Sequence, residues 1–71
     1  MKTKAGDDIY ITKREKEIIV LISLGFTTKQ ISISLFISEL TVKTHRHNLL
    51  KKLKAKNSVE LVNMSIRKRI I

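Results

Sequence analysis

Apolar residues recur along most of the chain at three- and four-residue steps, the spacing that places side chains on one face of a helix. This pattern predicts helices at about residues 13–24, 28–35, 39–53 and 59–69. Their lengths are ordinary for a small domain. We therefore expect an all-α fold, a four-helix bundle.

Capping residues mark the starts of the first three predicted helices. Thr12 and Glu15 fit a capping box, in which each side chain accepts a bond from the other residue's backbone amide. Thr27 and Gln30 repeat the arrangement before the second helix, and Ser38 is a good N-cap for the third. Only about three residues join the second helix to the third, which is typical of a helix-turn-helix.

The third predicted helix has two different faces. One face is expected to enter the core, and it carries Val42, Leu49 and Leu53, with His45 and Arg46 between them. The opposite face is mostly cationic or hydrogen-bonding, and it carries Leu40, Lys43, Thr44, His47 and Lys51. We expect this second face to meet an anionic partner, although a merely solvated basic face is the simpler alternative.

The charge balance supports an anionic partner. Residues 40–56 contain six Lys or Arg and no Asp or Glu, and the whole chain has 15 Lys or Arg against six Asp or Glu, a net charge of +9. Such a surplus points to DNA, RNA or an anionic membrane. Aromatic residues are only 4% of the chain, too few for the stacking platforms that hold single strands, so duplex DNA is favoured.

Several other classes of protein fit poorly. The chain has no Cys for a disulfide or a thiolate zinc site, and its longest apolar run, residues 18–24 interrupted by Ser23, is far shorter than the about 20 residues that span a bilayer. His45 and His47 are two apart on a helix and point in different directions, which is wrong for joint metal binding. We expect a cytoplasmic protein that is not an enzyme and holds no metal, cofactor or small-molecule ligand.

Outside the third helix, the pattern assigns four further roles. Residues 1–10 are predicted to be a flexible arm or linker remnant, and residues 11–71 the domain. Phe36 is expected to close one edge of the core. Leu61, Val62 and Ser65 can face the core from the fourth helix. Another side of this helix forms a candidate dimer interface, which consists of Val59, Asn63, Ile66 and Ile70.

From residue 11 to residue 62 the chain resembles the LuxR-type helix-turn-helix domain, which is the DNA-binding output module of many bacterial regulators and, in a few cases, a complete small regulator. The resemblance rests on five motifs at characteristic spacing: residues 11–15 (ITKRE), 25–31 (GFTTKQI), 35–38 (LFIS), 41–45 (TVKTH), and 52–53 with 57 and 60–61. It implies a homodimer on double-stranded DNA, with the third helix in the major groove and the fourth helix at the two-fold contact. RNA polymerase is a further candidate partner.

The resemblance also implies residue roles. Base contacts are expected from Lys43, Thr44 and His47, whose donors and acceptors suit base edges. Phosphate contacts are expected from Lys29 and Thr41, which would fix register without reading sequence, and we add the third-helix cations Arg46 and Lys51 to this set. His45 is expected to be a packed structural residue.

The chain departs from the family pattern at three positions. Ser32 replaces the usual Ala, a change that is tolerable if its hydroxyl bonds back to the helix, and Ser58 replaces a common Arg. Leu40 replaces a polar residue, and two alternatives stay open for it: contact with a thymine methyl, or packing under the turn.

Two alternative functions share parts of the same pattern. The chain could be a protein-interaction module that docks through the fourth helix, or a domain like the DNA-binding region of σ factors, which shares the opening motif. A cationic membrane-surface peptide would need one continuous amphipathic helix instead.

Overall fold

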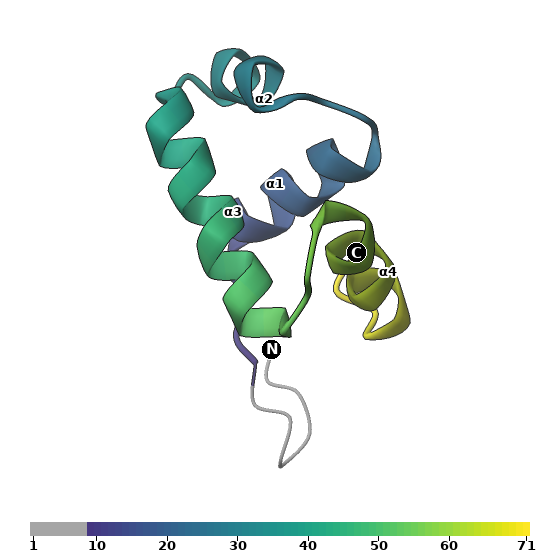
Figure 1. Cartoon of the computed structure of the whole chain (residues 1–71). Coiled ribbons are helices and arrows are strands. Elements are labelled where there is room, and N and C mark those ends of the chain that lie inside the picture. The colour runs from purple at the N-terminus through teal and green to yellow at the C-terminus, as the bar shows by residue number, and fades with distance from the viewer. Residues whose placement is uncertain (1–8) are drawn as a thin grey trace.

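The structure, a computed structural model, describes residues 9–71 and contains four helices in this range: α1 (Lys13–Ser23), α2 (Thr28–Leu35), α3 (Glu39–Leu53) and α4 (Ser58–Arg67). Helix α1 contacts each of the other three, and in Figure 1 it lies between α3 and α4, with α2 beside the first turns of α3. No strand occurs in residues 9–71. The all-α prediction is confirmed, and the bounds of α2 and α3 agree with the predicted ranges.

Every helix begins with a side-chain cap. Both predicted capping boxes are present: Thr12 Oγ1 accepts from the Glu15 amide at 3.0 Å, and Thr27 Oγ1 accepts from the Gln30 amide at 3.1 Å. Ser38 Oγ accepts from the amide of Thr41 at the start of α3. These bonds use backbone donors that helix formation leaves without partners, so each cap fixes where its helix starts.

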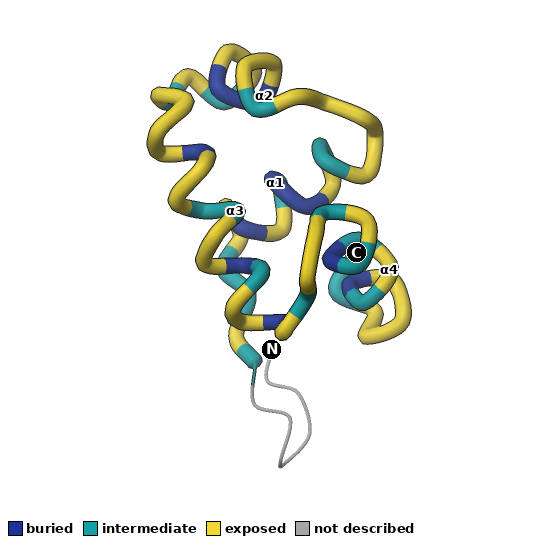
Figure 2. Tube along the Cα trace, viewed as in Figure 1, coloured by how far each residue is buried: buried dark blue, intermediate teal, exposed yellow. Residues whose placement is uncertain are grey.

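A single hydrophobic core joins the four helices. Its fully buried members come from all four, and they are Ile18, Ile19, Ile31, Val42, Leu49, Leu53 and Leu61. Figure 2 shows buried segments, in dark blue, on all four helices. The predicted inner face of α3 is thereby confirmed, and so are Leu61 and Ser65 of α4; Ser65 is fully buried and donates to the Leu61 carbonyl. Val62, which was predicted to share this face, is only half-buried and lines a groove between α4 and the end of α1 instead.

Ser32 and Gly25 satisfy local backbone requirements. The Ser32 hydroxyl donates to the Lys29 carbonyl at 2.7 Å, as the replacement of Ala requires, so a polar group is buried at little cost. Gly25 follows the C-cap of α1 with φ of 90°, a conformation that a residue without a Cβ adopts readily.

The prediction for Phe36 is wrong. Its side chain is 93% exposed, because Phe36 is the C-cap of α2 and takes the left-handed conformation, with φ of 58°. This cap reverses the chain, and Ile37 follows with its amide bonded to the Ser32 carbonyl. Ile37, not Phe36, packs against the core.

The two ends of the domain also differ from expectation. Helix α4 starts at Ser58 behind the cap Asn57 and ends at Arg67, two residues early, so Ile70 does not continue its stripe but packs against the core. At the other end Ile9 packs against the core. Residues 1–8 of the predicted arm lie outside the described residues.

Candidate nucleic-acid interface

The outer face of α3 is exposed along its whole length. We define this face by Leu40, Lys43, Thr44, His47 and Lys51, all of which are exposed. Val42, Leu49 and Leu53 on the opposite side are buried, so the core holds α3 from behind and leaves the outer face open. A helix supported in this way presents a fixed row of side chains to a partner.

Hydrogen bonds order the hydroxyl groups at the start of this face. Thr41 Oγ1 lies 2.9 Å from Ser38 Oγ, and Thr44 Oγ1 donates to the Leu40 carbonyl at 3.0 Å. The Thr44 hydroxyl hydrogen is therefore used within the helix, while its oxygen lone pairs and its methyl group stay available. Leu40 is 73% exposed, which eliminates packing under the turn as its role.

Lys29 is the second residue of α2. Its neighbour Thr28 accepts a hydrogen bond from Arg46 of α3 at 3.1 Å, which fixes the two helices at this point. The Lys29 side chain is exposed. An exposed cation in this place is free to contact an anionic partner.

The structure gives Arg46 a different role from the predicted phosphate contact. Its guanidinium is half-buried, and it donates to Thr28 Oγ1 of α2 and to Ser58 Oγ of α4. Arg46 thus connects α3 to the first residue of both neighbouring helices. The Ser58 that replaces a common Arg is the acceptor of one of these bonds, so Arg46 is a positioning residue for α3.

Lys52 is the second cation of α3 that the fold itself uses. Its ammonium lies 2.8 Å and 2.9 Å from the two carboxylate oxygens of Glu15, and it also donates to the Tyr10 carbonyl. Glu15 is only 6% exposed. Burial raises the pKa of Glu15, but the bonds from Lys52 and Thr12 outweigh it, and the pKa is lowered from its ordinary 4.5.

Sequence reasoning missed both of these links. It assigned Glu15 to a capping box alone and counted Lys52 and Arg46 with the free basic residues. The six cations of residues 40–56 are therefore not equivalent, and those left for a partner are Lys43, Lys51, Lys54 and Lys56. The sequence did contain a signal for the ion pair. Glu15 is an acidic residue close to the core positions of α1, and residues 40–56 offer only basic charges to pair with it.

Replacing Glu15 with Gln tests the stabilising effect of the charge. Gln keeps the capping acceptor, as Gln30 does in α2, but removes the charge opposite Lys52. Because Lys52 is partly exposed, we expect the free energy of unfolding at neutral pH to fall by only about 1 kcal/mol.

The expected pH dependence has a definite sign. Glu15 has a lower pKa folded than unfolded, so its charge stabilises the fold above pH 4.5, and this contribution is lost as the pH falls through the folded pKa. Urea unfolding of both proteins over a descending pH series should show the two stabilities converge. A gap that stays constant into acid would contradict the ion-pair assignment.

The two histidines differ as expected in exposure, His45 being half-buried and His47 exposed. No group of three His, Asp or Glu side chains that could hold a metal ion occurs in the described part of the chain. None of the helices there is long and apolar enough to cross a membrane.

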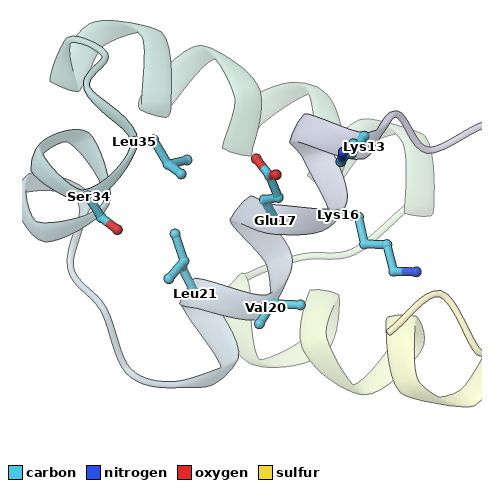
Figure 3. Close-up of a pocket in the computed structure, with 7 residues that line it drawn as sticks. All are labelled: Lys13, Lys16, Glu17, Val20, Leu21, Ser34 and Leu35. Atoms are coloured by element: carbon cyan, nitrogen blue, oxygen red, sulfur yellow. The ribbon is translucent and has the colours of Figure 1, made fainter.

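A groove of about 560 Å³ separates α1 from α2. In Figure 3 Ser34 and Leu35 of α2 point towards Leu21 of α1, while Lys16 extends away from the hollow. Since α1 packs against the inner side of α3, this groove lies behind the outer face and is separate from it.

Helix α4 also carries exposed apolar side chains. Val59 is 71% exposed, Ile66 is 55% exposed, and Asn63 is exposed between them. We call these three residues the α4 surface. A smaller groove of about 250 Å³ adjoins it, lined in part by Ile22 at the end of α1. Ile70, which was predicted to share this surface, lies against the core instead.

Known proteins resemble the chain in sequence and in fold. The luxR family of bacterial regulatory proteins matches residues 10–65. The CsgBAC operon transcriptional regulatory protein of Escherichia coli is 49% identical over 53 residues, which cover 75% of this chain and 24% of that protein. The uncharacterized response regulatory protein YgeK of the same species is 39% identical over 67 residues, 94% of this chain and 46% of that protein.

A solved structure gives the same answer for the fold. The response regulator ChrA of a heme-sensing two-component system matches with a TM-score of 0.85 and 34% sequence identity, over 87% of this chain and 31% of ChrA. The chain thus spans less than half the length of these relatives. The match favours a regulator over the σ-like and protein-docking alternatives. The sequence and the helix-turn-helix of the chain together show that it belongs to the luxR family of bacterial regulatory proteins and is a DNA-binding domain of transcription regulators.

Proposed function

We propose that the chain recognises specific sequences in double-stranded DNA by placing α3 in the major groove. The observation that supports this most is the outer face of α3, which is exposed and free of acidic residues while the opposite face is held in the core. The major groove is wide enough for a helix, and each base pair presents a distinct pattern of donors and acceptors there.

Within this proposal the outer face divides into base-reading and phosphate-binding residues. Lys43 donates to guanine O6 or N7, Thr44 offers its lone pairs or methyl, and His47 donates to or accepts from a base edge. Lys29, Thr41 and Lys51 contact phosphates and fix the register of the helix. Arg46 acts indirectly, because its bonds to Thr28 and Ser58 set the position of α3.

We further propose a homodimer formed through the α4 surface. Val59 and Ile66 expose apolar area that a protomer of this size leaves uncovered, and Asn63 between them can bond to its own copy across a two-fold axis. A two-fold dimer would place two copies of α3 on successive turns of one face of the duplex. The small groove beside Val59 gives the partner helix room to seat.

The proposed function also indicates a cellular location and a further partner. DNA and RNA polymerase share the bacterial cytoplasm, so we place the chain there. We also propose that the bound regulator contacts RNA polymerase, and that this contact is the step by which it changes transcription.

The salt dependence of duplex binding tests this arrangement. Each Lys–phosphate contact releases a counterion, so the logarithm of the association constant should fall linearly with that of salt concentration. Replacing Lys51 with Ala removes one contact per protomer and should reduce this slope by about 2 for a dimer.

Lys16→Ala is the matched control, since Lys16 is an exposed lysine on α1, away from the outer face. Its slope should stay at the wild-type value. Equal losses of slope for the two variants would show that the charge acts diffusely, and would contradict the docking of α3.

A further inference from the structure

Leu40 is an exposed apolar residue on a face that is otherwise polar or cationic. Its side chain is 73% exposed, and it shares the outer face with Lys43, Thr44 and His47. An exposed leucine is by itself unremarkable, because much of any protein surface is apolar. Its position is more informative, because Leu40 is the second residue of α3.

The start of α3 is the part closest to the bases if the helix docks as proposed. In helix-turn-helix proteins the first residues of the recognition helix contact base edges. The Ser38 and Thr41 hydroxyls are bonded to each other at this end, which uses one of their two hydroxyl hydrogens and leaves the other for a phosphate. In this docking Leu40, which is exposed, enters the groove with an apolar side chain.

Thr44 extends the apolar character by one turn. Its hydroxyl donates to the Leu40 carbonyl at 3.0 Å, which fixes the side chain and uses its only donor within the helix. Leu40 and Thr44 are four residues apart and so are neighbours on the helix surface. Together they form a small apolar strip at the reading end of α3, with Lys43 beside it.

We propose that this strip reads a thymine, with Leu40 packing against the thymine C5 methyl group. This methyl is the one apolar group that a base presents in the major groove of unmodified DNA, so an apolar side chain distinguishes thymine from the other bases. The proposal rests on the proposed function, and it makes Leu40 a specificity-determining residue. Lys43 beside the strip would read a guanine near that thymine.

Replacing thymine by deoxyuridine tests the proposal, because it removes only the methyl group. The duplex is one obtained by selection from a random pool with the wild-type chain, and each symmetric pair of thymines is replaced in turn. Replacement of one of these pairs should weaken wild-type binding by about fourfold for each half-site, because one buried methyl group is lost. The Leu40→Ala variant should bind the thymine duplex and the duplex with deoxyuridine at this pair equally.

Two further variants keep the result interpretable. Leu24→Ala shortens another exposed leucine, 67% exposed at the end of α1, and should keep the full deoxyuridine effect. Thr44→Ser removes the other methyl of the strip and should leave most of the effect in place. Circular dichroism confirms that each variant is folded.

The outcomes separate this proposal from the proposed function. If selection yields a motif but no deoxyuridine pair weakens wild-type binding, or Leu40→Ala keeps the effect, the thymine assignment is overturned and the function stands. An effect that Thr44→Ser abolishes and Leu40→Ala retains would assign the methyl contact to Thr44 and also overturn it. If selection yields no motif, the proposed function itself fails.

Discussion

Replacing Lys43 with alanine should reduce the preference of the protein for its selected duplex over random duplex by about 5- to 150-fold for each half-site. Lys43 lies on the outer face of α3, where a single base-reading contact is worth about 1 to 3 kcal/mol of discrimination. The variant should still bind DNA, because the phosphate contacts remain. Fluorescence anisotropy with both duplexes at one salt concentration measures the ratio directly.

Lys29→Ala is the informative comparison for this experiment. It removes the same charge from the start of α2, where we expect a phosphate contact, and should weaken both duplexes alike. Lys16→Ala, on α1, should change neither affinity by more than a small factor. If Lys43→Ala and Lys29→Ala lower the two affinities in the same proportion, Lys43 does not read bases.

Replacing Ile66 with aspartate should strongly weaken the proposed homodimer. Ile66 is 55% exposed on α4, so a charge there is harmless to the isolated protomer but is buried against the partner in a two-fold interface. We expect the dimer dissociation constant to rise by about 100-fold. Sedimentation equilibrium measures it, and circular dichroism should show unchanged helicity.

Ile33→Asp provides the control for that variant. Ile33 is 64% exposed on α2, outside the α4 surface, and the same substitution there should leave the dimer constant unchanged. Sedimentation of Ile66→Asp identical to that of wild type would remove α4 from the interface. Weaker dimers in both variants would point instead to a general effect of the added charge.

Much of the fold was predictable because its local signals agree with its packing. The capping boxes at Thr12 and Thr27 and the cap at Ser38 fix helix starts through bonds between residues three apart, so a linear sequence contains all the information needed. The apolar period of α3 similarly separates Val42 and Leu49 from the outer face. The exposure of every residue on the outer face follows from the same period.

The errors concern residues whose surroundings depend on the tertiary arrangement. Phe36 is apolar and adjoins a helix, but the left-handed cap that it occupies turns its side chain to solvent. Lys52 and Glu15 are 37 residues apart, and only the packing of α1 against α3 brings them together. Ile70 fits the helical period, yet α4 ends before it. Periodicity assigns faces, whereas these features require the positions of whole helices.

The distinction between free and engaged cations changes the functional interpretation. Counting charges treats Arg46, Lys51 and Lys52 alike, but Arg46 and Lys52 bond to other helices, whereas Lys51 is exposed on the outer face. The basic character of α3 therefore serves two purposes. Part of it holds the helix in place, and the rest faces outwards.

Selection of bound duplexes from a random pool at near-physiological salt, followed by sequencing, tests the central claim most directly. A homodimer that places two copies of α3 in the major groove should enrich a two-fold symmetric motif, with half-sites separated by about one helical turn of 10 to 10.5 base pairs. A pool without any enriched sequence would contradict sequence-specific recognition and would leave the net charge of +9 as a source of non-specific binding alone.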